Sequence, residues 1–178
     1  MILLIGLPGS GKGTQGKMLA DQHGLHLVSM GELVRLYMTG DQRQRMLAGE
    51  LLDDQEVTDI LDRVLKSLPD NEECVLDGFP RTIPQAEWLL EQVKNGRFKI
   101  RHIFHLDASG KTVAARLKAR GRTDDRDEVI QERFHEYEEL THPLLDWFRK
   151  RGLEVTDVNA ERTPAEVNDD LIKYLESD

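Results

Sequence analysis

The amino-acid sequence predicts an α/β fold in which a five-stranded parallel sheet is covered by helices on both faces. Short apolar runs without polar alternation recur along the chain, which is typical of strands buried on both faces. Segments with helical spacing separate these runs, as in parallel strands joined by right-handed crossovers. A glycine-rich loop also lies between the first run and the first helical segment.

The first half of the chain begins with the apolar run Ile-Leu-Leu-Ile at residues 2–5, which predicts the first strand. A helix is expected over residues 14–23 and a second strand over residues 25–28. Residues 29–68 are helical in character. Turn-forming residues divide this stretch into pieces, namely Gly40, Gly49 and the pair Asp53-Asp54.

The second half of the chain adds three predicted strands, at residues 74–76, 100–106 and 153–158. Helices are expected at residues 84–93, at residues 109–120, as a long helix that ends near residue 150, and from residue 164 onward. Pro143 is expected to bend the long helix, because its ring does not fit a straight turn. Thr163, Pro164 and Glu166 match an N-cap, a first-turn proline and an N3 glutamate.

Composition limits the class of protein. A length of 178 residues suits one domain. The net charge of −9, from 24 Lys and Arg against 33 Asp and Glu, argues against nucleic-acid or anionic-membrane partners. The single cysteine, Cys74, cannot form an internal disulfide. The first apolar run is too short for a signal peptide or a membrane span, so we expect a cytoplasmic protein.

Residues 6–14 carry the strongest functional signal, because this glycine-rich loop follows a strand and opens a helix. Glycines let backbone N–H groups approach phosphate oxygens, and the helix N-terminus adds partial positive charge. Lys12 can then reach the β- and γ-phosphates. The residue after this lysine is Gly13 instead of the usual Ser or Thr, and the hydroxyl follows at Thr14. The loop therefore predicts a nucleoside triphosphate site.

Three ordered motifs resemble the adenylate kinases. They are Gly-x-Pro-Gly-x-Gly-Lys-Gly-Thr-Gln at 6–15, Asp-Gly-Phe-Pro-Arg-Thr at 77–82 followed by Gln-Ala-Glu at 85–87, and Arg-Thr-Asp-Asp at 122–125 before a helix that carries Arg133. The resemblance implies a P-loop NTPase-like three-layer fold as a single domain over residues 1–178. It also implies a helical arm over residues 29–52 that binds the nucleoside monophosphate, and a very short lid over residues 120–126.

The activity that this resemblance implies is transfer of the ATP γ-phosphoryl group to AMP, giving two ADP, with Mg²⁺ and as a monomer. Two alternatives stay open: a UMP/CMP-type or broad nucleoside monophosphate kinase, and a catalytically weak nucleotide-binding module. The second is motivated by the short lid and by Met30, since relatives usually have threonine at this position facing the base. Asp53 likewise stands where relatives usually have proline.

The resemblance also implies roles for individual residues. The catalytic set would be Lys12, Arg81, Arg116, Arg122 and Arg133. ATP would contact Gly9, Ser10, Gly11, Lys12, Gly13, Thr14, Arg116 and Arg120. AMP would contact Met30, Arg35, Glu50, Leu51, Leu52, Gly78, Phe79, Pro80, Arg81, Gln85, Arg122 and Arg133. Within the AMP set, Arg35 and Arg81 would hold the phosphate and Gln85 would read adenine. Asp77 would support Mg²⁺ through water, with Thr14 as a further candidate.

Spacing and charge agree with these roles. Arg116 and Arg120 are four residues apart and share a helix face. Arg81 follows the carboxyl end of a predicted strand, where open α/β sheets bind ligands. The five cations of the catalytic set oppose about four negative charges on magnesium-bound ATP plus AMP. The attacking phosphate oxygen is already deprotonated, so no general base is expected.

Overall fold

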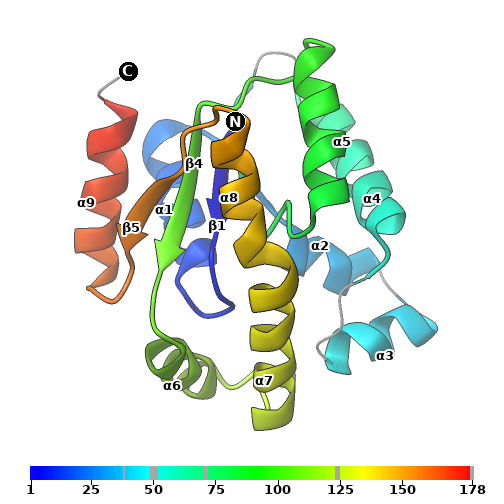
Figure 1. The fold of residues 1–178 in the computed structure, drawn as a ribbon, viewed down its shortest axis with the longest axis vertical. Coiled ribbons are helices and arrows are strands. Elements are labelled where there is room, and N and C mark those ends of the chain that lie inside the picture. Colours follow the sequence, from blue (N-terminus) through cyan, green and yellow to red (C-terminus); the bar gives the residue numbers. More distant parts are fainter. Residues whose placement is uncertain (38, 49–51, 70–71, 123–124, 177–178) are drawn as a thin grey trace.

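Five parallel strands form one sheet within the part of the chain that the computed structural model describes, residues 1–37, 39–48, 52–69, 72–122 and 125–176. In chain order they are β1 (Ile2–Ile5), β2 (His26–Ser29), β3 (Cys74–Asp77), β4 (His102–Asp107) and β5 (Thr156–Asn159). Their order across the sheet is β2-β3-β1-β4-β5, and Figure 1 shows β1, β4 and β5 in this order. The predicted fold class is therefore confirmed. The strands after β1 each end one residue later than expected, and β5 also begins three residues later.

Helices connect the strands and cover the sheet. Each crossover brings the chain back to the amino-terminal end of the sheet, so the next strand runs parallel to its neighbours. Their bounds are α1 (Lys12–His23), α2 (Met30–Tyr37), α3 (Gly40–Ala48), α4 (Asp54–Ser67), α5 (Ile83–Lys94), α6 (Gly110–Arg120), α7 (Asp127–Glu136), α8 (His142–Lys150) and α9 (Pro164–Leu175). Among the described residues, no helix combines the length and apolar composition that crossing a bilayer requires.

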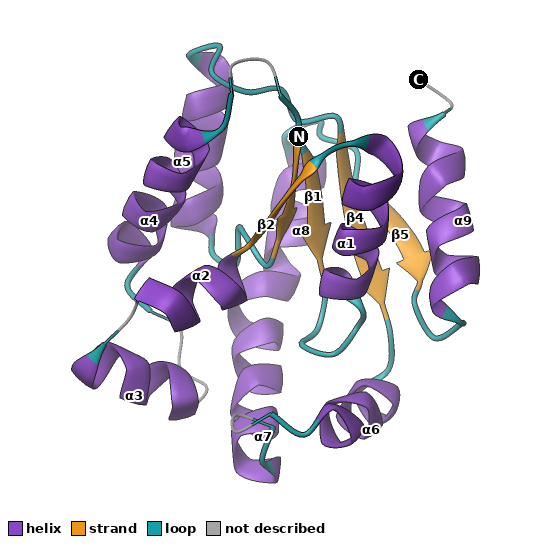
Figure 2. Cartoon of the chain, turned by 180° about the vertical axis from the view of Figure 1, so that it is seen from behind, coloured by secondary structure: helices purple, strands orange, loops and turns teal. Residues whose placement is uncertain are grey.

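Both faces of the sheet are buried, which explains the unbroken apolar runs. Leu3 and Ile5 belong to a core cluster shared with α4, α5 and α8. Ile2 and Leu4 belong to a second cluster shared with α1 and α9. Figure 2 shows α1 on the near side of the sheet and α8 on the far side. The core thus consists of two layers, one on each side of the central strands.

The predicted long helix is not continuous. A π-helical turn over Tyr137–Thr141 joins α7 to α8, and Pro143 lies in the first turn of α8. Proline has no N–H to donate to the preceding turn, and a π turn accommodates the local change in hydrogen bonding. The sequence therefore placed the irregularity correctly but did not indicate its form.

Two helix starts follow their sequence patterns. The Asp53 side chain caps α4, accepting hydrogen bonds from the backbone N–H groups of Gln55 at 2.9 Å and Glu56 at 3.4 Å. This cap gives a structural reason for an aspartate at a position where proline was expected. Thr163 and Glu166 form the predicted capping box at the start of α9, with Pro164 in the first turn.

We predict that Asp53→Ala lowers the free energy of unfolding by about 1 kcal/mol, because the first N–H groups of α4 lose their acceptor. Urea unfolding measures the change. Asp53→Ser, which keeps a capping oxygen, is the control and should lose much less. Equal losses for the two variants would show that the cap is not the source of the stabilisation.

Candidate active site

A cavity of about 1050 Å³ lies at the carboxyl ends of the strands. From β1 the chain crosses to β2, at one edge of the sheet. From β3 it later crosses to β4, on the opposite side of β1. The strand order therefore reverses beside β1. Ligands of open α/β sheets bind at such switch points. The volume reaches the upper end of the usual range for small-ligand pockets. The cavity is therefore large enough for a sizeable small-molecule ligand.

The loop after β1 forms one wall of this cavity. Gly9 and Gly11 have φ values of +90° and +106°, which side chains other than glycine rarely adopt. A Cβ atom on Gly9 would also lie 2.9 Å from the carbonyl oxygen of Val113. The Lys12 ammonium group donates to the carbonyl oxygens of Gly6 at 2.8 Å and Leu7 at 2.9 Å. The loop thus folds around its own lysine.

The charges around Lys12 converge as the sequence predicted. Burial lowers the pKa of Lys12 to about 8, and the Asp77 carboxylate opposes that shift. Further cations that lower this pKa are Arg81, Arg120 and Arg133. These arginines come from the loop after β3, from the end of α6 and from α7. Segments far apart in the sequence therefore bring positive charge to one point.

Arg81 is held by its main chain and its side chain. Its backbone N–H donates to Gln85 Oε1 at 2.9 Å, and its carbonyl oxygen accepts from Thr141 Oγ1 at 3.0 Å. Its Nε donates to the Gly78 carbonyl oxygen at 3.0 Å. Burial lowers the pKa of Arg81, and Asp77 opposes this effect. The π-helical turn, which supplies Thr141, thereby helps to seat Arg81.

Asp125 organises the connection between α6 and α7, although sequence analysis gave it no separate role. Its side chain is 1% exposed and accepts from Arg120 Nε at 2.9 Å and Nη2 at 2.6 Å. It also accepts from the Arg122 backbone N–H at 3.0 Å, and Arg133 Nη1 lies 3.7 Å away. The sequence shows two consecutive aspartates here, and nothing in it singles out Asp125.

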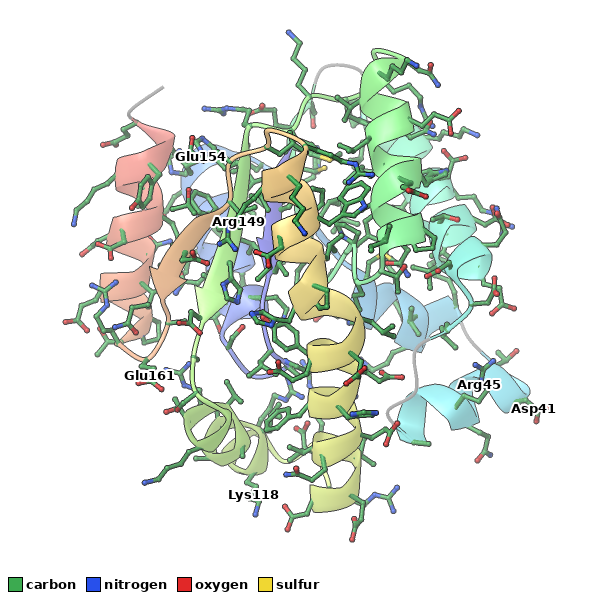
Figure 3. All side chains as sticks on the ribbon, in the orientation of Figure 1. Asp41, Arg45, Lys118, Arg149, Glu154 and Glu161 are labelled. Atoms are coloured by element: carbon green, nitrogen blue, oxygen red, sulfur yellow. The ribbon has the colours of Figure 1, made fainter. Side chains whose placement is uncertain are left out.

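The loop after β5 contributes a wall that sequence analysis also missed. Arg116 donates to the carbonyl oxygens of Ser10 and Arg162, each at 3.4 Å, so it bridges the two loops. Glu161 accepts from the Ser109 N–H and from Thr112 Oγ1, each at 3.0 Å, and so ties this loop to the start of α6 (Figure 3). The sequence did offer one signal for this wall, because the loop follows the carboxyl end of a predicted strand, where open α/β sheets bind ligands.

The cavity brings together nearly all the described residues that the sequence proposed. Its wall contains residues 9–14 together with Met30, Arg35, Leu52, Gly78, Pro80, Arg81, Gln85, Arg116, Arg120, Arg122 and Arg133. Phe79 differs, because its side chain has no exposed surface and packs edge-on against Trp88 with ring centroids 6.0 Å apart. It fills the core instead of the cavity wall. Glu50 and Leu51 lie outside the described residues.

Asp77, which ends β3, fits a magnesium ion that arrives with a nucleotide. Its Oδ2 accepts from Ser29 Oγ at 3.0 Å, and a Cβ on Gly13 would lie only 3.4 Å from the same oxygen. Thr14 is exposed and lines the same cavity. Where the structure describes the chain, no group of three or more His, Cys, Asp or Glu could hold a metal. Mg²⁺ commonly uses one or two carboxylates plus phosphates and water, which suits this donor set.

Comparisons with known proteins agree along almost the whole chain. The profile of the family described as adenylate kinase matches residues 4–153. An adenylate kinase of Synechococcus sp. (strain CC9902) is 33% identical over 98% of both chains. Adenylate kinase 1 of Nostoc sp. (strain PCC 7120) is 35% identical over 99% of this chain and 98% of its own. An adenylate kinase of Bacteroides fragilis (strain YCH46) is 32% identical over 99% of this chain and 98% of its own.

Proposed function

Because the chain belongs to the adenylate kinase family, we infer that it is an ATP:AMP phosphotransferase that converts ATP and AMP to two ADP. The convergence of Lys12, Arg81 and Arg133 on one cavity is the observation that carries this function. Phosphoryl transfer depends on positioning and on stabilising charge that develops in the transition state. A cluster of cations that are themselves partly desolvated by burial would supply that stabilisation.

The two nucleotides would enter from opposite sides of this cluster. The loop over residues 9–14 would cradle the ATP phosphates with Lys12, while Arg116 would approach them from α6. Gln85, Arg35 and Leu52 line the other side, where AMP would bind. Arg81 lies close enough to Lys12 to affect its pKa, which supports a position between the two phosphate groups.

Magnesium would be carried by ATP and supported by Asp77 through water, with Thr14 as the second candidate. When bound, Mg²⁺ neutralises part of the charge on the transferring phosphate. The chain's own task is to hold Lys12 and Asp77 at fixed positions around it. The hydrogen bond from Ser29 to Asp77 orients that carboxylate before any nucleotide binds.

Residues 120–126 would act as the short lid and residues 29–52 as the AMP-binding arm. The lid proposal is supported by Asp125, which accepts hydrogen bonds from both the Arg120 side chain and the Arg122 backbone N–H and so ties the end of α6 to the start of the next helix. A lid of this length excludes little water by itself. Neither a pyrimidine monophosphate kinase nor a weak nucleotide-binding module is favoured by the family match.

The direct test is ADP formation from ATP and AMP with Mg²⁺ in a coupled assay. We predict that Lys12→Met lowers kcat about 10²- to 10³-fold, because a preorganised cation is lost from the phosphoryl group. Lys111→Met is the control, since Lys111 is exposed on α6 and does not line the cavity. Absence of ADP formation by the unaltered protein, or equal rates for Lys12→Met, would refute the function.

A second prediction concerns pH. Lys12 titrates near pH 8 in the free protein, so its positive charge is complete below that value and is lost as pH rises. We expect kcat/KM for MgATP to fall about tenfold per pH unit above pH 8, because this parameter reports the free enzyme. Bound phosphates raise the pKa of a nearby cation, so kcat should fall only at higher pH.

The control for this prediction is Lys12→Arg, whose guanidinium keeps its charge throughout. Calorimetric titration with MgATP from pH 7 to pH 9 should show falling affinity for the unaltered protein and constant affinity for Lys12→Arg. A constant affinity in the unaltered protein would contradict the assigned titration of Lys12.

A third prediction tests the seat of Arg81. Gly78 has φ +76°, and a Cβ there would lie 3.1 Å from Arg81 Nη2. Gly96 has nearly the same φ, +75°, with no atom within 4 Å of the added Cβ. We expect both Gly→Ala variants to lose about 1 kcal/mol of stability or more. Only Gly78→Ala should also lower kcat/KM for AMP, by about tenfold, since its Cβ displaces the guanidinium.

Chemical denaturation and steady-state kinetics measure the two effects separately. The apparent KM for ATP should stay within about twofold in both variants, because the atoms nearest to an added Cβ on Gly78 all belong to Arg81 and a Cβ on Gly96 meets no atom within 4 Å. Equal AMP kinetics for the two variants would show that crowding at Arg81 does not matter.

A further inference from the structure

A chain of hydrogen bonds connects α4 to the base-facing wall of the cavity. Asp54 opens α4, and its Oδ1 accepts from Gln85 Nε2 at 2.8 Å and from Thr82 Oγ1 at 2.7 Å. Gln85 Oε1 in turn accepts from the Arg81 backbone N–H at 2.9 Å. Gln85 is 2% exposed and lines the cavity, whereas Asp54 is not part of the cavity wall. Asp54 can therefore influence a ligand only through the residues that it holds.

This arrangement gives the Gln85 amide a single orientation. An ionised carboxylate only accepts hydrogen bonds, so the Nε2 end must face Asp54. A backbone N–H only donates, so the Oε1 end must face Arg81. A flipped amide would place oxygen against oxygen and N–H against N–H in a buried site, which is costly. The assignment of oxygen and nitrogen is thus determined by both neighbours.

A fixed amide can distinguish two bases of nearly identical shape. Each end of the Gln85 amide retains one further hydrogen-bonding position beyond those already used. Adenine presents an amino donor beside the N1 acceptor, whereas hypoxanthine presents an oxo acceptor beside an N1–H donor. An amide that complements one pattern opposes the other, and sites built on hydrogen bonds reject mismatched ligands strongly.

We propose that Asp54 is a positioning residue that sets the preference for AMP over IMP by holding the Gln85 amide in one orientation. This inference rests on the proposed function, in which Gln85 reads the base of the acceptor nucleotide. Asp54 does not touch the substrate. It determines which end of the Gln85 amide, the N–H donor or the oxygen acceptor, faces each position of the base.

The experiment compares kcat/KM for AMP and for IMP, each with saturating MgATP, in the unaltered protein and in variants at residue 54. Asp54→Ala removes the acceptor, so the amide can rotate or flip. We expect kcat/KM for AMP to fall about tenfold to one hundredfold. The value of kcat/KM for IMP should stay the same or rise, because a flipped amide complements hypoxanthine, so the ratio of kcat/KM for AMP to that for IMP narrows by about tenfold or more. The KM for ATP should remain within about twofold.

Two further variants separate positioning from general damage. Asp54→Asn keeps an oxygen that can accept both bonds, so it should restore the AMP to IMP ratio to within about threefold of the unaltered protein. Asp53→Ala weakens the same end of α4 without touching Gln85, and it should leave the ratio unchanged. Thermal unfolding shows whether Asp54→Ala is folded. If it is not, Asp54→Ser provides the same comparison, because its hydroxyl group is too short to reach Gln85.

The possible results distinguish this inference from the function beneath it. If the unaltered protein does not phosphorylate AMP, the proposed function fails. If it does, but the AMP to IMP ratio of Asp54→Ala stays within about twofold of the original, the positioning role of Asp54 is refuted while the function stands. An equal loss in Asp54→Asn and Asp54→Ala would also refute it, because charge and not amide orientation would then explain the effect.

Discussion

The free-energy cost of burying several cations close together around Lys12 is the constraint on which the rest of the site depends. The chain carries a net charge of −9, yet it gathers Lys12, Arg81 and Arg133 in one partly desolvated cavity. Burial lowers the pKa of Lys12 and of Arg81, which means that holding both as cations costs free energy. Asp77 offsets only part of this cost. A polyphosphate would supply the opposing negative charge, so the arrangement of these cations favours a ligand of that kind before it binds.

The sheet makes this gathering possible. All paired strands run parallel, so their carboxyl ends lie at the same end of the sheet. The loops after β1, β3 and β5 therefore open into the same cavity. The two core layers fix the strands from both sides, so these loops start from rigid points. Hydrogen bonds then join the loops to one another, as when Arg116 connects the phosphate loop to the loop after β5. These rigid loops hold the cationic side chains at fixed positions around the cavity.

Much of this architecture was predictable from the sequence, for physical reasons. Buried parallel strands and the phosphate loop are local patterns, and their order predicts where the loops converge. The sequence did not predict which way individual side chains face or which residues they contact. Phe79 lies inside a functional motif, but a motif does not show which side of the chain faces the core. Asp125 could not be separated from its neighbour, and the contact of Asp54 with Gln85 joins residues 31 positions apart. The π-helical turn before Pro143 was predicted only as a bend, because a proline marks the place of an irregularity and not its hydrogen-bonding pattern.

The two halves of the site differ in how they meet a ligand. Lys12 and Arg116 donate to backbone carbonyl groups, and Arg120 is paired with Asp125. A phosphate must replace some of these partners, so binding on this side is an exchange of hydrogen bonds with modest net gain for each. Gln85, by contrast, keeps its partners Asp54 and Arg81 while it faces the cavity. Its remaining hydrogen-bonding positions are oriented before the ligand arrives, and such preorganisation lowers the cost of binding the matching base. On the proposed roles, discrimination between bases would therefore depend on the rigid amide network, whereas the cations proposed to stabilise phosphoryl transfer would change partners during each turnover.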